Sequence, residues 1–445
     1  MNVLLVSLGC DKNLVDSEMM LGMLADAGYR ITDDESEADI IIVNSCCFIM
    51  DAKQESIDTL IEMGRLKEQG RCRALIVTGC LAQRYAKEIH EEIPEVDAVI
   101  GTTGAGQLIA VIESVLAGKS QDAVMGADQA LLYGKRRILT TGGYYAYLKI
   151  AEGCDKHCTY CIIPKVRGHY RSVPMEALLE EAEKLSEQGV KELNLVAQET
   201  TVYGQDLYGK KSLPELLKRL CRIDGIEWIR ILYCYPEEID EELILTMKEE
   251  KKICHYLDLP IQHADDEILR KMGRRTNRDS LRETIEKLRS EIPDICLRTT
   301  LITGFPGETK EMFENLASFV DEMEFDRLGV FTYSAEEDTP AAVMPDQIAE
   351  EEKEFRRNEI MLLQQEIAFE RAEAMIGRVL PAMVEGRLTD EDVIVARTYM
   401  DAPGIDGNVF IETDRDLYSG AMIRVRITGS NEYDLIGELA DEFTE

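Results

Sequence analysis

The sequence contains 445 residues, of which 45% are hydrophobic and 30% charged, as expected for a globular protein of about three domains. Its longest uncharged apolar run spans residues 40–50, which is too short for a membrane helix of roughly 20 residues and excludes a membrane protein. The formal net charge of −35 disfavours DNA and bulk RNA as partners and favours a basic protein, although acidity also serves solubility alone.

Residues 1–118 alternate short apolar runs with helix-like stretches. The pairs are VLLVS with residues 14–27, DIIIVN with 52–68, ALIVT with 81–92, and AVIG with 105–116. This alternation predicts an α/β fold that begins with an open parallel sheet covered by helices on both faces. The first residues, MNVLLVSLGC, lack the basic lead of a signal sequence, and we expect them to form the first strand of a cytoplasmic protein.

Cysteines follow three of these predicted strands. Cys10 follows the first run, Cys46 and Cys47 follow the second, and Cys80 follows the third. Carboxyl ends of parallel strands meet at the edge of the sheet that binds ligands, so we expect a three-thiol site there. Cytoplasmic thiols stay reduced, which favours metal ligands or core residues over disulfides. The pattern does not choose between Cys46 and Cys47, because neighbouring side chains of an extended segment point in opposite directions.

A polar, glycine-containing segment over residues 119–143 predicts a linker. A second series of strands and helices follows over residues 144–340. Its strand candidates are YAYLKIAE, ELNLVAQ, WIRILYCYP, YLDLPIQ, CLRTTLITGFP and RLGVFTYS. Helical stretches between them predict a partial or complete parallel (βα) barrel, whose active site we expect at the carboxyl ends of the strands.

The stretch after the first barrel strand carries Cys154, Cys158 and Cys161 in a CxxxCxxC pattern. Thiolates bind iron–sulfur clusters, and three thiolates on a four-iron cluster leave one iron open to another ligand. The same spacing also matches one helix face with cysteines as core residues. Zinc is a further alternative, although only His157 lies nearby as a fourth ligand. The polar residues 155–157 and the preceding glycine favour a loop, and therefore the cluster.

Polar residues after the other barrel strands are candidates for the same cavity. They are Gln198, Glu199, Tyr235, Gln262, His263 and the run from Gly304 to Glu308. Each has a plainer alternative, since His263 suits a helix cap and GFPGE suits a turn. The sequence has no GxGxxG or Walker pattern, so nothing indicates nucleoside triphosphate chemistry.

After residue 340 the sequence first shows a helical pattern and then a strand pattern. Residues 341–376 include a charged helical pattern with Ile348, Phe355 and Leu362 spaced by seven, which predicts a connecting helix packed on the barrel. From residue 377 to 445, five short alternating runs predict a small all-β barrel. Residues 371–445 hold seven arginines, no lysine and sixteen acidic residues, a net charge of −9, whereas barrels that bind RNA need a basic face.

Four segments, SLGCDKNLVDSE, VNSCCFI, VTGCLAQRY and EGCDKHCTYCIIPKVRG, are together similar to the methylthiotransferases of the radical SAM superfamily. The resemblance covers essentially the whole chain. It implies an amino-terminal domain with a second cluster, a radical SAM partial barrel and a carboxyl-terminal TRAM barrel.

The resemblance also implies the cofactors and their ligands. Two [4Fe-4S] clusters are expected, one on Cys154, Cys158 and Cys161, whose open iron binds S-adenosylmethionine, and one on Cys10, Cys46 and Cys80. The family pattern thus selects Cys46 over Cys47. Tyr160 is expected to pack beside the adenine, and the further cofactor-binding candidates are Gln198, Glu199, Gly304 and Glu308.

Within this family, SLGCDKN, the QET run before Tyr203 and Gly204, YLDLPIQHADD and RVRITGSNEYDLIGEL resemble the RimO-type branch. That branch modifies an aspartate of a small-subunit ribosomal protein, a basic partner that the acidic barrel also favours over tRNA. Two departures from the branch pattern are Asp11, where proline is common, and Glu199, where aspartate is common. Neither departure removes a cluster ligand.

The implied reaction needs a radical, because the carbon–hydrogen bond beside a carboxylate is too strong for acid–base catalysis at neutral pH. A deoxyadenosyl radical is expected to take hydrogen from the aspartate β-carbon, and the second cluster to deliver sulfur, with a reductant protein as a further partner. The alternatives are a tRNA adenosine methylthiotransferase and a non-catalytic iron–sulfur or zinc scaffold. The remaining cysteines, expected in the core, are Cys72, Cys221, Cys234, Cys254 and Cys296.

Overall fold

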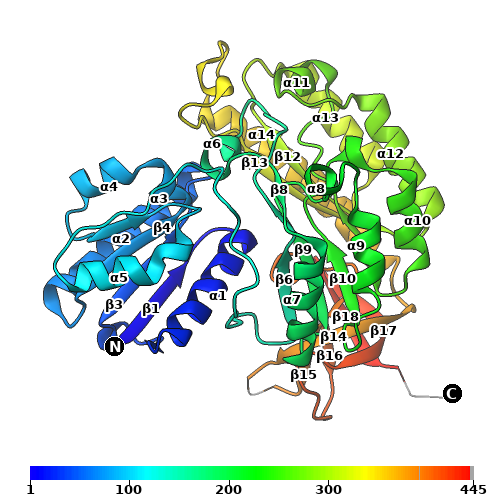
Figure 1. Ribbon diagram of the computed structural model, residues 1–445. Coiled ribbons are helices and arrows are strands. Elements are labelled where there is room, and N and C mark those ends of the chain that lie inside the picture. The colour runs from blue at the N-terminus through cyan, green and yellow to red at the C-terminus, as the bar shows by residue number, and fades with distance from the viewer. Residues whose placement is uncertain (390, 441–445) are drawn as a thin grey trace.

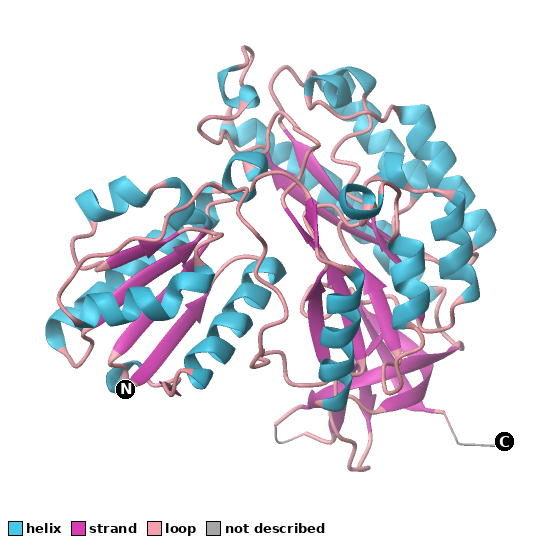
Figure 2. Cartoon of the chain, viewed as in Figure 1, coloured by secondary structure: helices cyan, strands magenta, loops and turns pink. Residues whose placement is uncertain are grey.

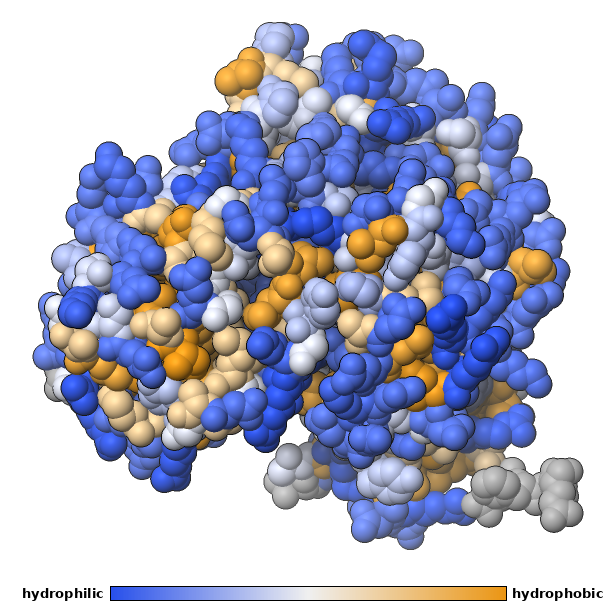
Figure 3. Space-filling model, viewed as in Figure 1, coloured by the Kyte–Doolittle hydropathy of each residue, from blue (hydrophilic) through white to orange (hydrophobic). Residues whose placement is uncertain are grey.

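A computed structural model describes residues 1–389 and 391–440 (Figure 1). The chain forms an amino-terminal α/β unit, a half-open barrel of parallel strands and a small closed β-barrel, which confirms the predicted fold class. Residues 390 and 441–445 of the expected carboxyl-terminal domain lie outside the described residues. The face drawn in Figure 3 is mainly hydrophilic, in keeping with the acidic composition. None of the described helices is long and apolar enough to cross a membrane.

The amino-terminal sheet has five parallel strands in the order β2-β1-β3-β4-β5. The strands are β1 (Asn2–Ser7), β2 (Arg30–Ile31), β3 (Ile40–Ser45), β4 (Ala74–Gly79) and β5 (Ala98–Ile100). The helices are α1 (Asp11–Asp26), α2 (Met50–Gln69), α3 (Cys80–Arg84), α4 (Ala86–Glu92) and α5 (Leu108–Leu116), with short 3-10 turns at Glu35–Glu37 and Ala105–Gln107. Every residue of β3 and β4 is buried, because helices cover both faces of the sheet (Figure 2).

Between Leu116 and Tyr145 the chain forms no helix or strand, and this whole segment is described. Ala123 makes one bridge to Ile100 at the edge of the sheet. Further along, the backbone at Arg136 packs directly on α1, where a side chain on Gly22 would clash with the Arg136 carbonyl group. A glycine on this helix face therefore lets the segment lie close.

The central sheet has six parallel strands in the order β13-β12-β11-β10-β9-β6 and is not closed within the described residues, so the barrel is partial. The strands are β6 (Tyr145–Lys149), β9 (Glu192–Val196), β10 (Trp228–Ile231), β11 (Ile253–Asp258), β12 (Cys296–Thr303) and β13 (Arg327–Thr332). The helices are α6 (Ile163–Arg167), α7 (Met175–Glu187), α8 (Gln205–Tyr208), α9 (Leu213–Leu220), α10 (Glu241–Glu249), α11 (Asp266–Lys271), α12 (Arg278–Glu291) and α13 (Lys310–Met323). A two-stranded ribbon, β7 (Ala151–Glu152) with β8 (Arg171–Ser172), flanks the cysteine triplet, and 3-10 turns lie at Pro236–Glu238 and Pro340–Val343.

The connecting helix is present as α14 (Glu350–Glu373), but the apolar spacing used to predict its packing lies on the wrong face. Phe355 and Leu362 are 54% and 58% exposed. The helix packs against β13 and α13 through Ile360 and Ile367 instead. A spacing of seven residues identifies one face of a helix, and here the tertiary contacts use another.

The five predicted carboxyl-terminal strands form a closed barrel in the order β14-β15-β16-β18-β17. They are β14 (Val379–Arg387), β15 (Val393–Thr398), β16 (Val409–Glu412), β17 (Met422–Asn431) and β18 (Asp434–Leu439). This barrel lies against the amino ends of the central strands, where Glu192, the first residue of β9, bonds to Arg397 of β15 at 2.6 Å. The carboxyl ends of the central strands are left for the site.

Candidate functional site

Three strand-end cysteines of the amino-terminal domain share one edge of the sheet. The strands β1, β3 and β4 are neighbours in the sheet. Cys46 directly follows β3, Cys80 directly follows β4, and Cys10 lies in the turn after β1. Gly9 has φ +84°, and a Cβ atom there would lie 2.8 Å from Cys46 Sγ. Glycine at this position thus allows the Cys10 turn and the Cys46 thiol to approach each other.

Cys47 is fully buried. It belongs to an apolar cluster that includes Leu60 and Met63 of α2 and also Cys80. Burial raises the pKa of the Cys47 thiol to about 11, while nearby Arg84 opposes the rise. Cys46, in contrast, has Cys10 and Arg167 among its charged neighbours. The close approach of the Gly9 turn to the Cys46 sulfur favours Cys46 as the ligand.

The cysteine triplet lies in a loop after β7 and not on a helix, so the helix-face alternative is wrong for this stretch. Gly153, with φ +82°, brings the loop against the carbonyl group of His169, where a side chain would clash. Cys154 N donates to Gly168 O at 3.1 Å, and Thr159 N donates to Met272 O at 2.9 Å. No group of three or more His, Cys, Asp or Glu among the described residues is arranged to hold a single metal ion.

Burial raises the pKa of Cys154 to about 11 and also raises the pKa of Cys161, because the thiolate form loses solvation. Cations and a phenol surround the thiols. Tyr235 Oη lies 3.7 Å from Cys158 Sγ, and the Arg274 guanidinium stacks 4.3 Å from the centre of the Tyr235 ring. Positive charge at this site, whether from these side chains or from bound iron, favours the thiolates.

Four buried polar atoms around the triplet have no hydrogen-bond partner. They are Tyr170 Oη, Glu199 Oε2, Glu237 Oε2 and Arg274 Nε. Buried polar atoms are almost always paired in native proteins, so this set indicates a missing polar ligand. Because it contains both acids and bases, it fits a molecule with an amine, a carboxylate and hydroxyl groups, as S-adenosylmethionine has. The three thiols beside it fit a four-iron cluster with one open iron.

Three of the predicted cofactor-binding residues lie around this triplet. Gln198 accepts from Gly153 N at 2.9 Å and so holds the loop. Glu199 is 1% exposed, and burial raises its pKa to about 7, while Lys156 at 3.7 Å opposes the rise. Tyr160 packs on the apolar cluster around Phe305, and burial raises the pKa of its phenol.

The other two predicted residues serve the turn after β12. Gly304, with φ +72°, lies against Lys353 of α14, and its N–H donates to Glu308 Oε2 at 2.9 Å. Glu308 Oε1 accepts from Arg356 at 2.7 Å. Burial would raise the pKa of the Glu308 carboxyl group, but its interactions with His263 and then Arg356 outweigh burial and lower it. His263 Nε2 lies 3.5 Å from Glu308 Oε2, and its Nδ1 accepts from the N–H of Asp265. Asp265 is the residue that caps α11, so His263 is not the helix cap. The Glu308 carboxylate is therefore already occupied by the protein.

Charged residues that the sequence analysis did not select join the two thiol sites. Arg167 is 2% exposed and its Nε donates to Cys80 Sγ at 3.4 Å. Burial raises the pKa of the Cys80 thiol, and the Arg167 charge opposes this rise. Arg167 Nη1 also donates to Glu152 Oε2 at 2.9 Å. Both residues lie within the segment EGCDKHCTYCIIPKVRG, so charged residues beside a thiol motif were the available signal.

The amino-terminal domain meets the barrel near the carboxyl end of β10. Tyr233 Oη donates to Asp11 Oδ1 at 3.1 Å, and Lys12 Nζ lies 3.3 Å from the centre of the Tyr233 ring. Asp11 follows Cys10, and Tyr233 lies two residues before Tyr235, the neighbour of the triplet. The two thiol sites therefore open toward the same rim of the barrel.

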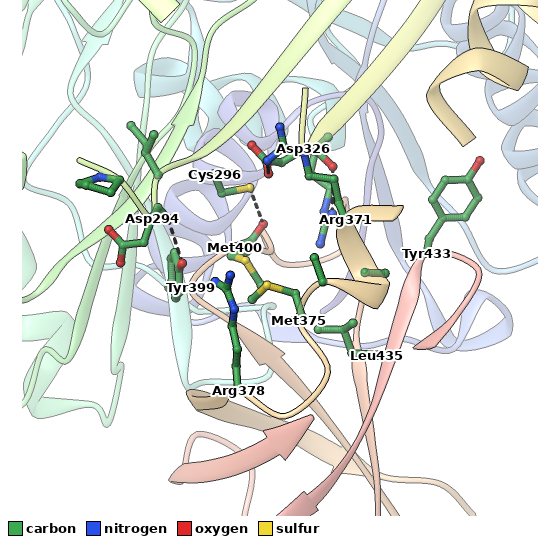
Figure 4. A pocket seen from close by; sticks show the side chains of 15 residues that line it. Asp294, Cys296, Asp326, Arg371, Met375, Arg378, Tyr399, Met400, Tyr433 and Leu435 are labelled. Atoms are coloured by element: carbon green, nitrogen blue, oxygen red, sulfur yellow. Dashed lines mark hydrogen bonds and ion pairs between the residues drawn. The ribbon is translucent and has the colours of Figure 1, made fainter. Parts of the chain in front are cut away.

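A cavity of about 170 Å³ lies elsewhere, between the central strands and the small β-barrel (Figure 4). Its wall includes Cys296 and Arg327, the first residues of β12 and β13, and Met400. Cys296 donates to Met400 O at 3.3 Å, and Arg371 pairs with Asp326 at 3.4 Å. This cavity is at the amino ends of the strands, opposite the triplet.

Three family models match the chain: the uncharacterized protein family UPF0004 over residues 2–101, the radical SAM superfamily over 148–320 and the TRAM domain over 376–440. A Lachnoclostridium phytofermentans protein named ribosomal protein uS12 methylthiotransferase RimO is 63% identical over 437 residues, covering 98% of this chain and 99% of the relative. A Geobacter sulfurreducens protein of the same name is 50% identical over 440 residues and covers 98% of each chain.

Two solved structures share the fold at low sequence identity. The radical S-adenosylmethionine methyltransferase TsrM from Kitasatospora setae has a TM-score of 0.57 at 15% identity and covers 77% of each chain. The cobalamin-dependent S-adenosylmethionine radical enzyme OxsB has a TM-score of 0.53 at 14% identity, covering 82% of this chain and 56% of its own. These likenesses concern the fold alone.

Proposed function

The chain belongs to the RimO family of ribosomal protein uS12 methylthiotransferases, and on that premise we propose which residues carry out the reaction. It is a radical S-adenosylmethionine-dependent enzyme that adds a methylthio group to ribosomal protein uS12, and we assign the modified atom as the β-carbon of an aspartate. The observation that carries the proposal is the arrangement of two three-thiol sites at strand ends that open toward one barrel rim.

We assign a [4Fe-4S] cluster to Cys154, Cys158 and Cys161 and another to Cys10, Cys46 and Cys80. When bound, the first cluster with S-adenosylmethionine supplies radical chemistry that breaks an unactivated carbon–hydrogen bond, and the second supplies sulfur. The chain's own residues position these groups. Gln198 holds the amide of Gly153 at 2.9 Å and so orients the loop that presents the first thiols.

The unpartnered polar atoms of the barrel bind S-adenosylmethionine in this proposal. Arg274 Nε suits its carboxylate, whereas Glu199 and Glu237 accept hydrogen bonds from its amine or ribose hydroxyl groups. Lys156, already paired with Glu199 at 3.7 Å, adds positive charge nearby. Tyr160 flanks the adenine. Glu308 and Gly304 shape the turn after β12 through their mutual bond and the Arg356 contact. A buried polar group without a hydrogen-bond partner costs free energy. Binding of the ligand would supply these partners and so stabilise the site.

Each domain has its own role in this proposal. We assign the second cluster to residues 1–118, a linker to 119–143, the radical SAM barrel to 144–340, a connecting helix to 341–376 and the TRAM domain to 377–445, of which residues 390 and 441–445 lie outside the described residues. The net charge of −9 over residues 371–445 suits a basic ribosomal protein and disfavours tRNA, which would require a basic face. We place the enzyme in the cytoplasm, with a reductant protein as a second partner.

The proposal is tested by anaerobic reconstitution, counting of iron and sulfide, and incubation with dithionite, S-adenosylmethionine, uS12 and tRNA together. We expect two four-iron clusters per chain, formation of deoxyadenosine, and a mass gain on uS12. A mass gain on tRNA alone contradicts the substrate, and the absence of deoxyadenosine contradicts the radical chemistry.

Cysteine variants test the ligand assignment. Cys46→Ala should lose the iron of the second site because it removes one of three thiols. Cys47→Ala is the matched control and should retain both clusters, since it is the Cys46 sulfur that lies against the Gly9 turn before Cys10. Equal iron loss in both variants would contradict the choice of Cys46.

A further inference from the structure

The side chain of Arg167 crosses from the radical SAM barrel into the amino-terminal thiol site. It is the last residue of α6, which lies between the two domains in Figure 1. Nε donates to Cys80 Sγ at 3.4 Å, Nη1 to Asp16 Oδ2 at 3.0 Å, and Nη2 to Asn13 Oδ1. The bond from Arg167 Nε to Cys80 Sγ is, among the described residues, the hydrogen bond that a barrel residue makes to a thiol of the second site.

Two separate ties fix Arg167 to the loop of the triplet. Through side chains, Arg167 bonds to Glu152, Glu152 Oε1 accepts from Gln198 at 2.7 Å, and Gln198 accepts from Gly153 N at 2.9 Å. Through the backbone, Cys154 N donates to the carbonyl group of Gly168, the residue after Arg167, at 3.1 Å. The position of the guanidinium is therefore set by the loop that carries the first cluster's ligands.

The ions around Arg167 form a balanced group. Lys149 pairs with Asp16 and Glu152, and Arg167 pairs with the same two carboxylates. The two cations and two anions of this group carry no net charge. Their mutual pairing therefore needs no thiolate as a further counter-charge. The bond from Nε to Cys80 Sγ is an additional donor aimed at a sulfur.

We propose that Arg167 is a positioning residue for the second cluster: its guanidinium orients the Cys80 sulfur and, as a charged hydrogen-bond donor to it, raises the reduction potential of the cluster held there. Hydrogen bonds to ligand sulfurs and nearby charge are among the factors that set iron–sulfur potentials. The inference rests on the proposed function, which places a cluster on Cys10, Cys46 and Cys80. It adds that the triplet loop controls the electronic state of the sulfur-delivering site.

The test uses the full-length chain with Cys154, Cys158 and Cys161 replaced by alanine, so that only the second site can load. These replacements keep the backbone ties at Gly153 and residue 154. The reconstituted protein is titrated electrochemically and followed by electron paramagnetic resonance. In this background Arg167→Met should lower the equilibrium constant for reduction at least tenfold, a shift of about 59 mV to more negative potential for one electron. Arg167→Lys, which keeps the charge without the Nε donor, should shift it less.

Arg137→Met is the matched control. Arg137 is also buried and joins the two domains through Glu18 and Glu181. Within the described part of the chain, its side-chain hydrogen bonds go to these two carboxylates and to Tyr147 O, and none goes to a thiol. It should lower stability and leave the potential at the parental value. An Arg167→Met potential equal to that of Arg137→Met overturns the inference.

If Arg167→Met binds no iron, the reduction potential of Arg167→Lys is the deciding measurement. A potential equal to that of the parent chain overturns the inference. Failure of the proposed function gives a different result. In that case the parent chain itself loads no second cluster, whereas an unchanged potential in a loaded Arg167 variant contradicts only the role of Arg167.

Discussion

At the scale of single residues, Glu199 is the clearest case of a side chain prepared for a ligand. Its Oε1 accepts from Thr201 N at 2.9 Å, whereas its buried Oε2 has no hydrogen-bond partner. Lys156, at 3.7 Å, is the nearby cation. Burial outweighs this attraction and raises the pKa to about 7. The side chain thus changes charge near neutral pH beside the triplet.

The raised pKa of Glu199 predicts a pH-dependent stability. The folded state binds more protons than the unfolded state between the unfolded pKa, near 4.5, and about 7. Its stabilising contribution is therefore complete below the lower value and is lost as pH rises through the upper one. We expect Glu199→Gln to flatten the fall of the free energy of unfolding with pH over this range, by up to roughly 1.4 kcal/mol per pH unit. Measured without S-adenosylmethionine, the exposed control Glu351→Gln should keep the parental slope; identical slopes in both variants contradict the prediction.

At the scale of elements, α14 supports the rim of the barrel more than it connects domains. Lys353 Nζ donates to Tyr333 O at 2.8 Å just beyond β13, and Arg356 Nη1 donates to Glu308 Oε1 at 2.7 Å. Ile360 anchors the helix and is fully buried. The helix therefore holds the turn after β12 with charged side chains and the sheet with apolar ones.

Paired substitutions in α14 test which of its faces is buried. Ile360→Ala should destabilise the protein by about 2–5 kcal/mol, because it leaves a cavity in the main core. Leu362→Ala, two residues away and exposed, should change the free energy of unfolding by less than about 0.5 kcal/mol. Urea denaturation of the two variants and the parent gives both values. A larger effect from Leu362→Ala would mean that the apolar spacing of seven does mark the packed face.

At the scale of the whole molecule, the TRAM barrel covers the amino ends of the central strands, and the amino-terminal domain contacts the barrel near the carboxyl end of β10. Glu192 accepts from Arg230 at 2.9 Å and from Arg397 at 2.6 Å, and all three residues are buried. Arg298 reaches Asp406 at 2.6 Å beside them. Charged pairs thus fix the TRAM barrel at the strand ends that carry no thiols.

Breaking the Glu192 contacts should loosen this junction. Glu192→Gln leaves two buried guanidinium groups short of a counter-charge, which costs about 3–5 kcal/mol in comparable sites. The arginines lower the pKa of Glu192, so its contribution is present above the unfolded value near 4.5 and is lost as pH falls through the lower folded value. Thermal unfolding from pH 7 down to pH 3 measures both effects. Glu385→Gln, a less buried partner of Arg397, should cost less; equal losses contradict the central role of Glu192.

The sequence by itself determined the order of strands and helices, the three-part architecture and the strand-end placement of the cysteines. These features depend on local periodicity and on spacing along the chain, both of which are visible in a few consecutive residues. Cys10, Cys46 and Cys80 could be grouped because parallel strands end at a common edge. For the same reason Gln198 and Glu199 were expected at the barrel rim, and both lie beside the triplet.

Only the tertiary structure decided which faces and charges meet. Arg167 reaches Cys80 across 87 positions of sequence, and Arg397 reaches Glu192 across 205, distances at which no local pattern carries information. Phe355 and Leu362 face solvent because β13 and α13 cover a different side of α14. Periodicity shows that a helix has an apolar face, but burial is decided by what packs against it. For this reason the thiols were identifiable from their motifs, whereas the arginine that joins their two sites was found only in the folded chain.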